Sequence, residues 1–286
     1  MHPLLHVPFL SEQLMSEPLS CTAADFKTPR LRKCVFDLNS IDWRHSRRIG
    51  TGWDGCSWKI RIRGHDRLYA LKLFWDTEPG SCSPYTSSSG YHAPQRESQN
   101  NAILQQIQAA IENVEGPPIM INPNPKRRSH ALKNTYMFSQ EGRQAGLPNA
   151  KFEPMIISKM PRMRQCYGWV KISRSTLNTW PPHARPQPWV DDRLRRFISS
   201  NGDHIAIIYE YIKETEDGND PAAVKEVTDF LWRVGFGYSP ASLARNWKNG
   251  VLIDLSDIIH ASGYMWHEMH YGPREADQVL RWVGWE

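Results

Sequence analysis

Five residues in the first quarter of the chain have the types and spacing needed to bind phosphate. Gly50, Gly52 and Gly55 form a G-x-G-x-x-G pattern, and Ala70 and Lys72 follow in an apolar run. Glycines let backbone amides approach an anion closely, and a lysine neutralises the charge of nucleotide phosphates. The pattern therefore predicts a nucleotide-binding entrance. The alternative is an ordinary β-hairpin with glycines in its turn and a lysine at its edge.

The elements expected around these glycines distinguish between kinds of phosphate site. Apolar residues in strand-like runs predict strands over 47–52, 56–64 and 67–75. Alternation along the third run places Leu68, Ala70, Lys72 and Phe74 on one face and Tyr69, Leu71 and Leu73 on the other. A dinucleotide site needs a helix directly after the glycines, and a Walker A loop needs G-K-[ST]. Here a strand is expected after the glycines, and no G-K-[ST] follows them. A strand, a glycine loop, a strand and then a strand with A-x-K is the order that protein kinases use.

A kinase also needs a carboxylate on the next helix to hold the lysine in position. An apolar stripe predicts a helix over 93–114, and Glu97 lies close to the inward face that carries Leu104 and Ile111. Glu97 is therefore expected to contact Lys72. The alternative is a solvated glutamate, which the helix dipole favours near a helix N-terminus.

A later apolar run, "HIAIIYEYI" over 204–212, predicts another strand. The run resembles the hinge strand of a kinase, with Tyr209 in the gatekeeper place and Glu210 among the nucleotide-binding residues. A buried β-strand with no further role fits the same residues equally well. Asp220 and Pro221 then indicate the start of a second long helix.

The segment that should carry the catalytic groups is incomplete. The run "NGVLIDLSDII" over 249–259 predicts a strand, and Asn246 and Asp254 fit the pair that holds Mg²⁺ in kinases. The H-R-D triplet is missing, because its place is taken by "SPA" at 239–241. The base that accepts the substrate proton is therefore missing too, and no catalytic residue is predicted. The D-F-G glycine is also replaced, since Asp254 is followed by Leu255 and Ser256.

The sequence as a whole resembles a fungal family of truncated kinase-like proteins, named for an inner-kinetochore subunit of the Sim-four complex. The resemblance rests on "YALKLFW", "YHAPQRESQNNA", "QCYGWVKI" and "RNWKNGVLIDLSDII", and it covers roughly residues 44–258. It implies a kinase-like fold with impaired catalysis and, for the named member, a scaffolding role at the kinetochore. The long 115–152 segment departs from the family pattern.

We therefore predict an α+β, protein kinase-like fold. A five-stranded antiparallel sheet with one packed helix should form the N-lobe, and a truncated, mostly helical C-lobe should follow. Residues 1–30 are expected to be a flexible arm, and 31–286 the kinase-like domain. Within it, the N-lobe should span about 44–212 and the C-lobe about 213–286. The segment 115–152, rich in Pro, Asn and basic residues, should be a weakly packed loop whose deletion is tolerated.

Two functions follow from these residues. The first is a pseudokinase that acts as an interaction or scaffold module for protein partners. The second is a divergent phosphotransferase or ATP-binding protein that uses Lys72, Glu97, Asn246 and Asp254, with ATP and Mg²⁺ as cofactors. Phosphoryl transfer depends largely on positioning and electrostatics, so loss of the base alone does not exclude the second function.

Composition and charge narrow the partners and the cellular compartment expected for either function. The net charge of +5 over 286 residues permits anionic partners without requiring them, and nucleic acid is not indicated directly. Five cysteines without a C-x-x-C pair predict free thiols in a reducing compartment, either the nucleus or the cytoplasm. No apolar run approaches the roughly 20 residues that span a bilayer, so no membrane association is predicted.

Two smaller motifs, at 267–270 and 126–128, are weaker indications of a functional site. Residues 267–270 read H-E-x-H, which is one residue short of the H-E-x-x-H zinc motif. Lys126, Arg127 and Arg128 could serve nuclear import or phosphate contact, although three charges in a loop are usually only solvated.

Overall fold

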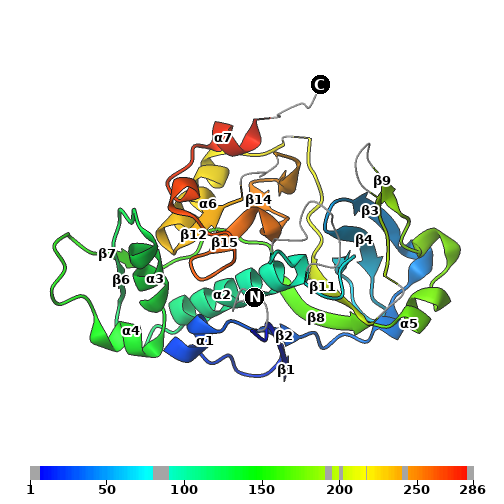
Figure 1. Cartoon of the computed structure of the whole chain (residues 1–286), viewed down its shortest axis with the longest axis horizontal. Coiled ribbons are helices and arrows are strands. Elements are labelled where there is room, and N and C mark those ends of the chain that lie inside the picture. Colours follow the sequence, from blue (N-terminus) through cyan, green and yellow to red (C-terminus); the bar gives the residue numbers. More distant parts are fainter. Residues whose placement is uncertain are drawn as a thin grey trace. The chain divides into compact units, whose positions relative to one another are not determined.

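The structure, a computed structural model, is that of an α+β protein, as predicted, and Figure 1 labels its helices and strands. The chain is divided between two compact units. It describes residues 7–79, 90–190, 195–199, 202–216, 218–239 and 244–281. Unit 1 comprises Met1–Glu17, Leu31–Ser98 and Gln165–Tyr211. Unit 2 comprises Pro18–Arg30, Gln99–Arg164 and Ile212–Glu286. This division differs from the predicted lobes, because unit 2 also takes in 18–30 and 99–164.

Unit 1 is built on a seven-stranded mixed sheet, not the predicted five-stranded antiparallel one. Its strand order is β1-β2-β8-β11-β5-β4-β3. The five strands from β8 to β3 pair antiparallel, whereas β2 pairs parallel with both β1 and β8. The strands are β1 Leu10–Leu14, β2 Leu31–Lys33, β3 Arg47–Thr51, β4 Gly55–Arg61, β5 Leu68–Phe74, β8 Cys166–Ile172 and β11 His204–Glu210.

The two additional strands come from the segment predicted to be a flexible arm and from the residues just after it. Trp169 on β8 anchors both: its backbone oxygen accepts from Cys34 N–H at 2.9 Å, and its indole Nε1–H donates to the Ser11 carbonyl at 2.8 Å. Another part of the arm forms helix α1, Ala23–Lys27, in unit 2, where Thr22 and Asp25 form a capping box. Long-range hydrogen bonds therefore order a segment that has little local signal of its own.

Strand β5 carries the predicted alternation between its two faces. Leu71 and Leu73 pack into one buried cluster with Trp58, whereas Ala70 and Phe74 belong to a second cluster. Successive side chains on a strand point to opposite faces, so both faces of the sheet are covered here. The smaller elements of unit 1 are η2 Leu38–Ser40, η3 Trp43–His45, α5 Arg174–Thr179, η4 Pro182–Ala184, β9 Trp189–Val190 and β10 Arg195–Arg196.

Helix α2, Ala93–Glu112, matches the helix predicted over 93–114 to within two residues. The boundary between the two units falls inside it, after Ser98. In unit 2, Ile103 and Ile107 on this helix are buried in the main apolar cluster. Within the described ranges, no helix has both the length and the apolar character needed to cross a bilayer.

Unit 2 contains the second predicted helix, α6, Pro221–Arg233, which begins as expected after its N-cap Asp220. The part after residue 212 is less helical than predicted, since it also contains short paired strands. The predicted strand over 249–259 is broken by a 3-10 turn into short pieces. The elements of this part are α6, β12 Phe236–Tyr238, η5 Ala244–Asn246, β13 Trp247–Lys248, β14 Val251–Leu252, η6 Leu255–Asp257, β15 Ile258–His260, η7 Glu268–His270 and α7 Ala276–Leu280.

The segment 115–152 is ordered structure within unit 2, not the predicted loop. It contains β6 Ile119–Ile121, α3 Arg128–Tyr136 and α4 Gln140–Ala145, and β6 pairs with β7 Met155–Ile157. Its few apolar residues include Ile121 and Phe138, both fully buried. Asn134 also ties the segment to α6, because its amide donates to the backbone oxygens of Asn122 and Arg233.

Candidate functional site

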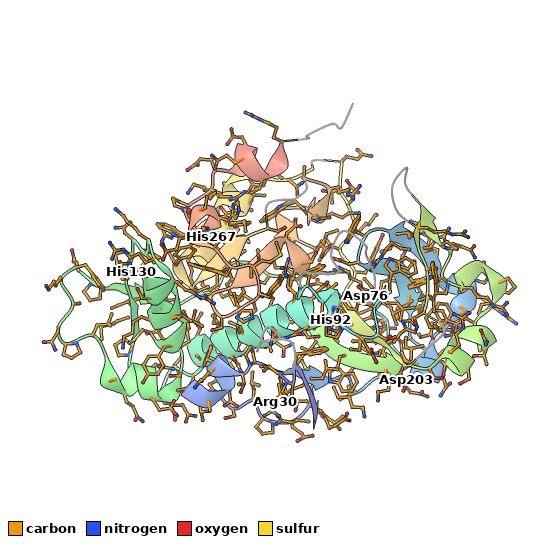
Figure 2. The ribbon with its side chains drawn as sticks, viewed as in Figure 1. Arg30, Asp76, His92, His130, Asp203 and His267 are labelled. Atoms are coloured by element: carbon orange, nitrogen blue, oxygen red, sulfur yellow. The ribbon has the colours of Figure 1, made fainter. Side chains whose placement is uncertain are left out.

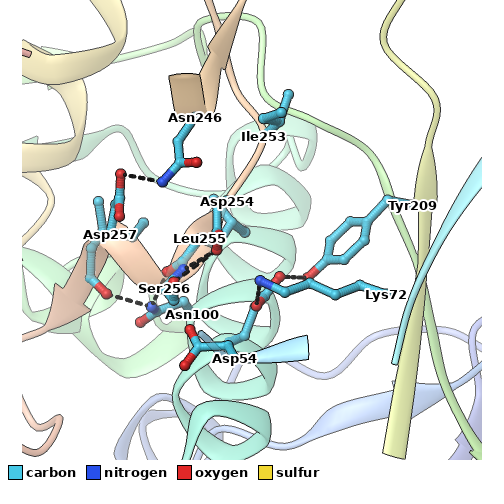
Figure 3. A network of polar contacts seen from close by, with 12 residues as sticks. Asp54, Lys72, Asn100, Tyr209, Asn246, Ile253, Asp254, Leu255, Ser256 and Asp257 are labelled. Carbon is cyan, nitrogen blue, oxygen red and sulfur yellow. Dashed lines mark hydrogen bonds and ion pairs between the residues drawn. The ribbon is translucent and has the colours of Figure 1, made fainter. Parts of the chain in front are cut away.

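The predicted lysine–glutamate contact is present in unit 1 (Figure 3). Lys72 Nζ on β5 donates to Glu97 Oε2 on α2 at 2.6 Å. The hydroxyl of Tyr209 on β11 donates to Glu97 Oε1, also at 2.6 Å. Strands β5 and β11 are neighbours with Ala70 opposite Tyr209, so two adjacent strands together hold one carboxylate.

This contact is buried, which decides between the two interpretations of Glu97. Glu97 is 0% exposed, and Lys72 is also buried. A solvated glutamate at a helix N-terminus is therefore excluded. Buried carboxylates are rarely tolerated unless paired and hydrogen bonded, and here each oxygen accepts a hydrogen bond. The arrangement fixes the lysine ammonium at one place beside the sheet.

The glycine turn between β3 and β4 is held by its own backbone and by one tryptophan. Gly52 N–H donates to the Gly55 oxygen at 2.9 Å, and the Trp75 indole donates to the Gly52 oxygen at 2.9 Å. The Trp75 backbone N–H also donates to the backbone oxygen of Asp54 at 3.1 Å. The turn is therefore tied to the residue that directly follows β5, the strand that carries Lys72.

A further contact at this turn is not indicated by the sequence. The Tyr91 hydroxyl donates to the Asp54 carboxylate, with both oxygens at 2.9 Å. Tyr91 lies shortly before α2, so the turn and the segment leading into the Glu97 helix share a hydrogen bond. Both residues lie within motifs used to predict the site, but nothing in their spacing indicates that they meet.

The three glycines have different structural roles. A Cβ on Gly55 would lie 2.1 Å from the Leu73 carbonyl oxygen, so the close pairing of β4 with β5 requires glycine there. A Cβ on Gly50 or Gly52 would meet nothing within 4 Å. Neither of these two residues has a positive φ. No contact in the described part of unit 1 therefore requires glycine at positions 50 and 52, whereas a ligand that approaches the backbone would.

This difference gives a direct prediction about stability. Gly55→Ala should lower the free energy of unfolding by about 1–3 kcal/mol, because the backbone must move to relieve the overlap. Gly50→Ala and Gly52→Ala should change it by no more than about 0.5 kcal/mol. Urea denaturation of the three variants, followed by tryptophan fluorescence, measures the difference. A cost as large at Gly52 as at Gly55 would contradict the distinction.

Ala70 and Glu210, the other predicted nucleotide-binding residues of unit 1, lie within the sheet. Ala70 is buried between β4 and β11, where it faces Lys59 and Tyr209. The Glu210 backbone N–H donates to the Gln165 oxygen at 2.9 Å. Both positions therefore serve the sheet, and their binding role stays a prediction.

In unit 2 the predicted metal pair has protein partners. Asn246 Nδ2 donates to Asp257 Oδ2 at 3.0 Å (Figure 3). Asp254 is the N-cap of the 3-10 turn η6, and its Oδ1 accepts from the backbone and the hydroxyl of Ser256 at 3.1 and 2.8 Å. Asn246 and Asp254 offer the oxygen ligands that Mg²⁺ prefers, so the donor set fits this metal.

Two further polar residues belong to this cluster, and one of them, Asn100, was not predicted from the sequence. Asp257 is buried and holds Asn246, and Asn100 on α2 donates to the Leu255 and Ile258 oxygens at 2.8 and 2.7 Å. Asn100 thereby fixes both ends of the turn that Asp254 caps. Among the residues that the structure places, no group of three or more His, Cys, Asp or Glu side chains could hold a metal, the 267–270 motif included.

His92, just before α2, is a buried histidine that should make unit 1 sensitive to acid. Its position is labelled in Figure 2. The ring is buried and packs edge-on against Phe9, with ring centroids 5.5 Å apart. Burial lowers the pKa of His92 from 6.5 to about 4, because the charged ring would lose its hydration.

The sign of the pH effect follows from this lowered pKa. Between pH 6.5 and 4 the unfolded chain binds a proton that the folded chain does not, so stability falls as pH falls. The loss should approach about 3 kcal/mol near pH 4 and be absent above about pH 7. Denaturation of the native chain and His92→Gln at several pH values tests this. Equal acid sensitivity of the two proteins would contradict it.

Comparisons with protein-family models, curated proteins and solved structures give no match for this chain. The kinase-like assignment and the resemblance to the kinetochore family therefore remain predictions. The geometry itself is that of an α+β protein with a buried, tyrosine-supported lysine–glutamate pair in the same unit as a glycine turn.

Proposed function

We propose that this chain is a catalytically impaired kinase-like protein that acts as an interaction or scaffold module. In this proposal unit 1 retains the nucleotide anchor, and catalysis has been lost. The resemblance to the fungal kinetochore family makes assembly of a kinetochore complex the proposed setting.

One observation carries the kinase-like part of the proposal. Lys72 on β5, the second strand after the glycine turn, contacts Glu97 on the following helix at 2.6 Å. Active kinases need this pairing of strand lysine and helix glutamate in place to position nucleotide phosphates. The open space beside Gly50 and Gly52 supports the same assignment, since a phosphate group could approach their backbone.

Impaired catalysis is supported by the groups at the catalytic segment. Ser239 occupies the position at which the H-R-D triplet of kinases begins. Its backbone N–H donates to the backbone oxygen of Asp257 at 2.7 Å. Pro240 and Ala241 lie outside the described residues, and neither side-chain type can accept a proton. Asn246 and Asp254 would hold Mg²⁺ with their oxygens, and the bound ion would neutralise phosphate charge. No residue at the H-R-D position would orient an acceptor hydroxyl as a base.

The second candidate function is a divergent phosphotransferase or ATP-binding protein. It would use Lys72 and Glu97 for the phosphates and Asn246 and Asp254 for the metal. The intact lysine–glutamate pair favours it, because a protein with no nucleotide role has no need to bury that pair.

The experiment that tests the proposal separates binding from transfer. Binding of ATP with Mg²⁺ or Mn²⁺ is followed by the shift in thermal midpoint, which reports ligand affinity for the folded state. Transfer is followed with labelled ATP and generic acceptors. We expect weak, metal-dependent binding that Lys72→Arg and Asp254→Ala reduce, and no detectable transfer.

The matched control is Lys171→Ala, which removes an exposed lysine from β8 of the same sheet. It should leave ATP binding unchanged. Robust transfer that disappears in both site variants would replace the pseudokinase proposal with the second candidate. Binding that survives both site variants would show that the glycine turn and Lys72 have no nucleotide role.

A further inference from the structure

Unit 2 carries a basic surface whose cations have no carboxylate partners among the described residues. Residues 116–140 contain no Asp or Glu, yet they include Lys126, Arg127, Arg128 and Lys133. None of these four side chains forms an ion pair with any residue that the structure describes. Four cations elsewhere in unit 2 do form ion pairs with carboxylates: Lys225, Arg233, Lys248 and Arg281.

Arg128 joins this basic segment to the loop that precedes η7. Its Nε donates to the Ala261 oxygen at 2.8 Å, and its backbone N–H donates to Glu268 Oε1 at 2.9 Å. Its guanidinium also lies over the Trp266 ring, 5.8 Å from the centroid. Both ends of the 261–268 loop are therefore held against the start of α3. Figure 2 labels His130 and His267 in these two segments.

Apolar side chains are exposed on this loop and on the two adjoining elements, η7 and α3. Met265 is 51% exposed, Met269 is 79% exposed, and Leu132 on α3 is 41% exposed. Met265 also has a φ of 68°. Of the described residues other than glycine, only Asn249 shares a positive φ, and asparagine tolerates that region far better than methionine. A strained backbone that holds an apolar side chain in solvent needs a reason outside the folding of unit 2.

A hollow of about 270 Å³ adjoins Met269. Met269, His270, Arg274 and Gln278 are among the residues that line it. Arg274 lies over the Tyr238 ring at 4.6 Å and has no carboxylate partner among the described residues. The carboxylates of the neighbouring helix α7 already form ion pairs: its N-cap Glu275 pairs with Lys225, and Asp277 pairs with Arg281. The hollow therefore offers a cation beside an apolar side chain.

We propose that this α3–η7 surface docks an acidic segment of a partner protein that carries apolar anchors. The surface is defined by Lys126, Arg127, Leu132, Lys133, Met265, Met269 and Arg274. The inference rests on the proposed interaction-module function and names the chemistry of its partner. Carboxylates of the segment would meet the unpaired cations, and its apolar side chains would cover the methionines, which adapt readily to different partners. A nucleic-acid backbone would satisfy the cations but would leave the methionines uncovered, so a protein segment fits better.

The test uses a labelled synthetic peptide rich in glutamate that carries two leucines. We expect the native chain to bind it by fluorescence anisotropy, more weakly as salt rises. The same peptide with serine in place of leucine should bind about tenfold more weakly. The triple variant Lys126→Glu, Arg127→Glu, Lys133→Glu should also lose about tenfold or more in affinity. Arg128 stays unchanged, because it holds the loop.

The matched control reverses three exposed lysines elsewhere on unit 2, with Lys27→Glu, Lys151→Glu and Lys213→Glu. It changes the net charge by the same amount, so its binding should fall much less than that of the surface variant. Equal losses in both variants would mean that only net charge matters and would overturn the proposal.

Met265→Gly provides a readout that general attraction cannot reproduce. Glycine accepts the positive φ, so the thermal midpoint should rise by a few degrees. Peptide affinity should nevertheless fall by about threefold to tenfold, because one apolar anchor is lost. A variant that is more stable and binds as tightly as the native chain would refute the role of Met265.

Two further outcomes would overturn the proposal. One is peptide binding that the triple variant leaves intact. The other is tighter binding of a single-stranded DNA oligonucleotide than of the peptide, lost in the same variant, which would assign the surface to nucleic acid. These readouts are separate from ATP binding and transfer, so failure of the docking surface and failure of the pseudokinase proposal can be told apart.

Discussion

Replacing Glu97 with alanine is expected to lower the free energy of unfolding by about 3–5 kcal/mol, far more than the loss of an exposed ion pair would. Glu97 is fully buried, and it accepts hydrogen bonds from Lys72 and Tyr209 at 2.6 Å each. The substitution leaves a buried ammonium without its counter-charge and a buried hydroxyl without its acceptor. Urea denaturation followed by tryptophan fluorescence measures the loss.

A surface ion pair in the same unit provides the control. Lys33 and Glu12 are 2.7 Å apart, nearly the same distance, but their side chains are 42% and 73% exposed. Glu12→Ala should therefore change the free energy of unfolding by at most about 1 kcal/mol. Similar losses for Glu12→Ala and Glu97→Ala would mean that burial is not what makes the Glu97 contact matter.

A double substitution shows whether the loss at Glu97 comes from the uncompensated charge. Lys72→Met combined with Glu97→Leu removes both charges and keeps apolar volume. Such replacements of buried ion pairs are often neutral or stabilising, so most of the Glu97→Ala loss should be recovered. The pair would then be dispensable for folding. Its retention would be explained by nucleotide binding, which the double variant should abolish.

The features that the sequence predicted correctly are those with a strong local pattern. The alternation along β5 placed Leu71 and Leu73 on one face and Ala70 on the other, and the structure confirms it. Helix α6 begins where Asp220 and a following proline indicate a start. The contact between Lys72 and Glu97 was predictable because an ordered set of motifs, not either residue alone, indicated it.

The features that were missed depend on contacts between distant parts of the chain. Strand β2 is only three residues long, and its position beside β8 is fixed by a hydrogen bond from Cys34 to Trp169. Asn100 meets the oxygens of Leu255 and Ile258, which are 155 and 158 residues further along the chain, and no local pattern indicates such a contact. A five-stranded sheet was expected because only the strongly periodic strands could be recognised.

The segment 115–152 was predicted to be a loop because its composition is polar and rich in proline. Composition underestimates a segment whose few apolar residues are mostly buried, as Ile119, Ile121 and Phe138 are. Composition also takes no account of polar side chains that hydrogen bond to the backbone, as the Asn134 amide does. The structure therefore reverses the expectation that this segment can be deleted: its removal should unfold unit 2.

Arg143, in the same segment, tests this reversal with a single substitution. Its guanidinium is buried and donates to three backbone oxygens, those of Pro117 at 2.6 Å, Ala110 at 2.8 Å and Asn113 at 3.1 Å. Two of these oxygens lie at the C-terminal end of α2, where helix carbonyls lack partners within the helix and a positive charge is favoured. The charge is thus offset by carbonyl dipoles, although burial lowers the pKa of Arg143.

Arg143→Met should lower the free energy of unfolding by about 2–4 kcal/mol, because three carbonyls lose charged hydrogen-bond donors. The value stays below the sum of three such bonds, since water can reach some of these oxygens through an adjoining cavity of about 340 Å³. Arg143→Lys should give an intermediate loss, because one ammonium cannot span the three acceptors as a planar guanidinium does. Urea denaturation of each variant measures these losses.

Arg185 in unit 1 makes the comparison specific. It also donates to backbone oxygens, those of Trp180 at 2.9 Å and Asn178 at 3.0 Å, but it is exposed and its partners are close in sequence. Arg185→Met should therefore lower the free energy of unfolding by less than about 1 kcal/mol. If Arg143→Met were as mild, the segment 115–152 would be peripheral after all, and the loop predicted from its composition would be the better description. A large loss of unfolding free energy for Arg143→Met, without a similar loss for Arg185→Met, would place the segment in the core of unit 2. The two arginines make similar hydrogen bonds, so the difference would come from the burial of Arg143.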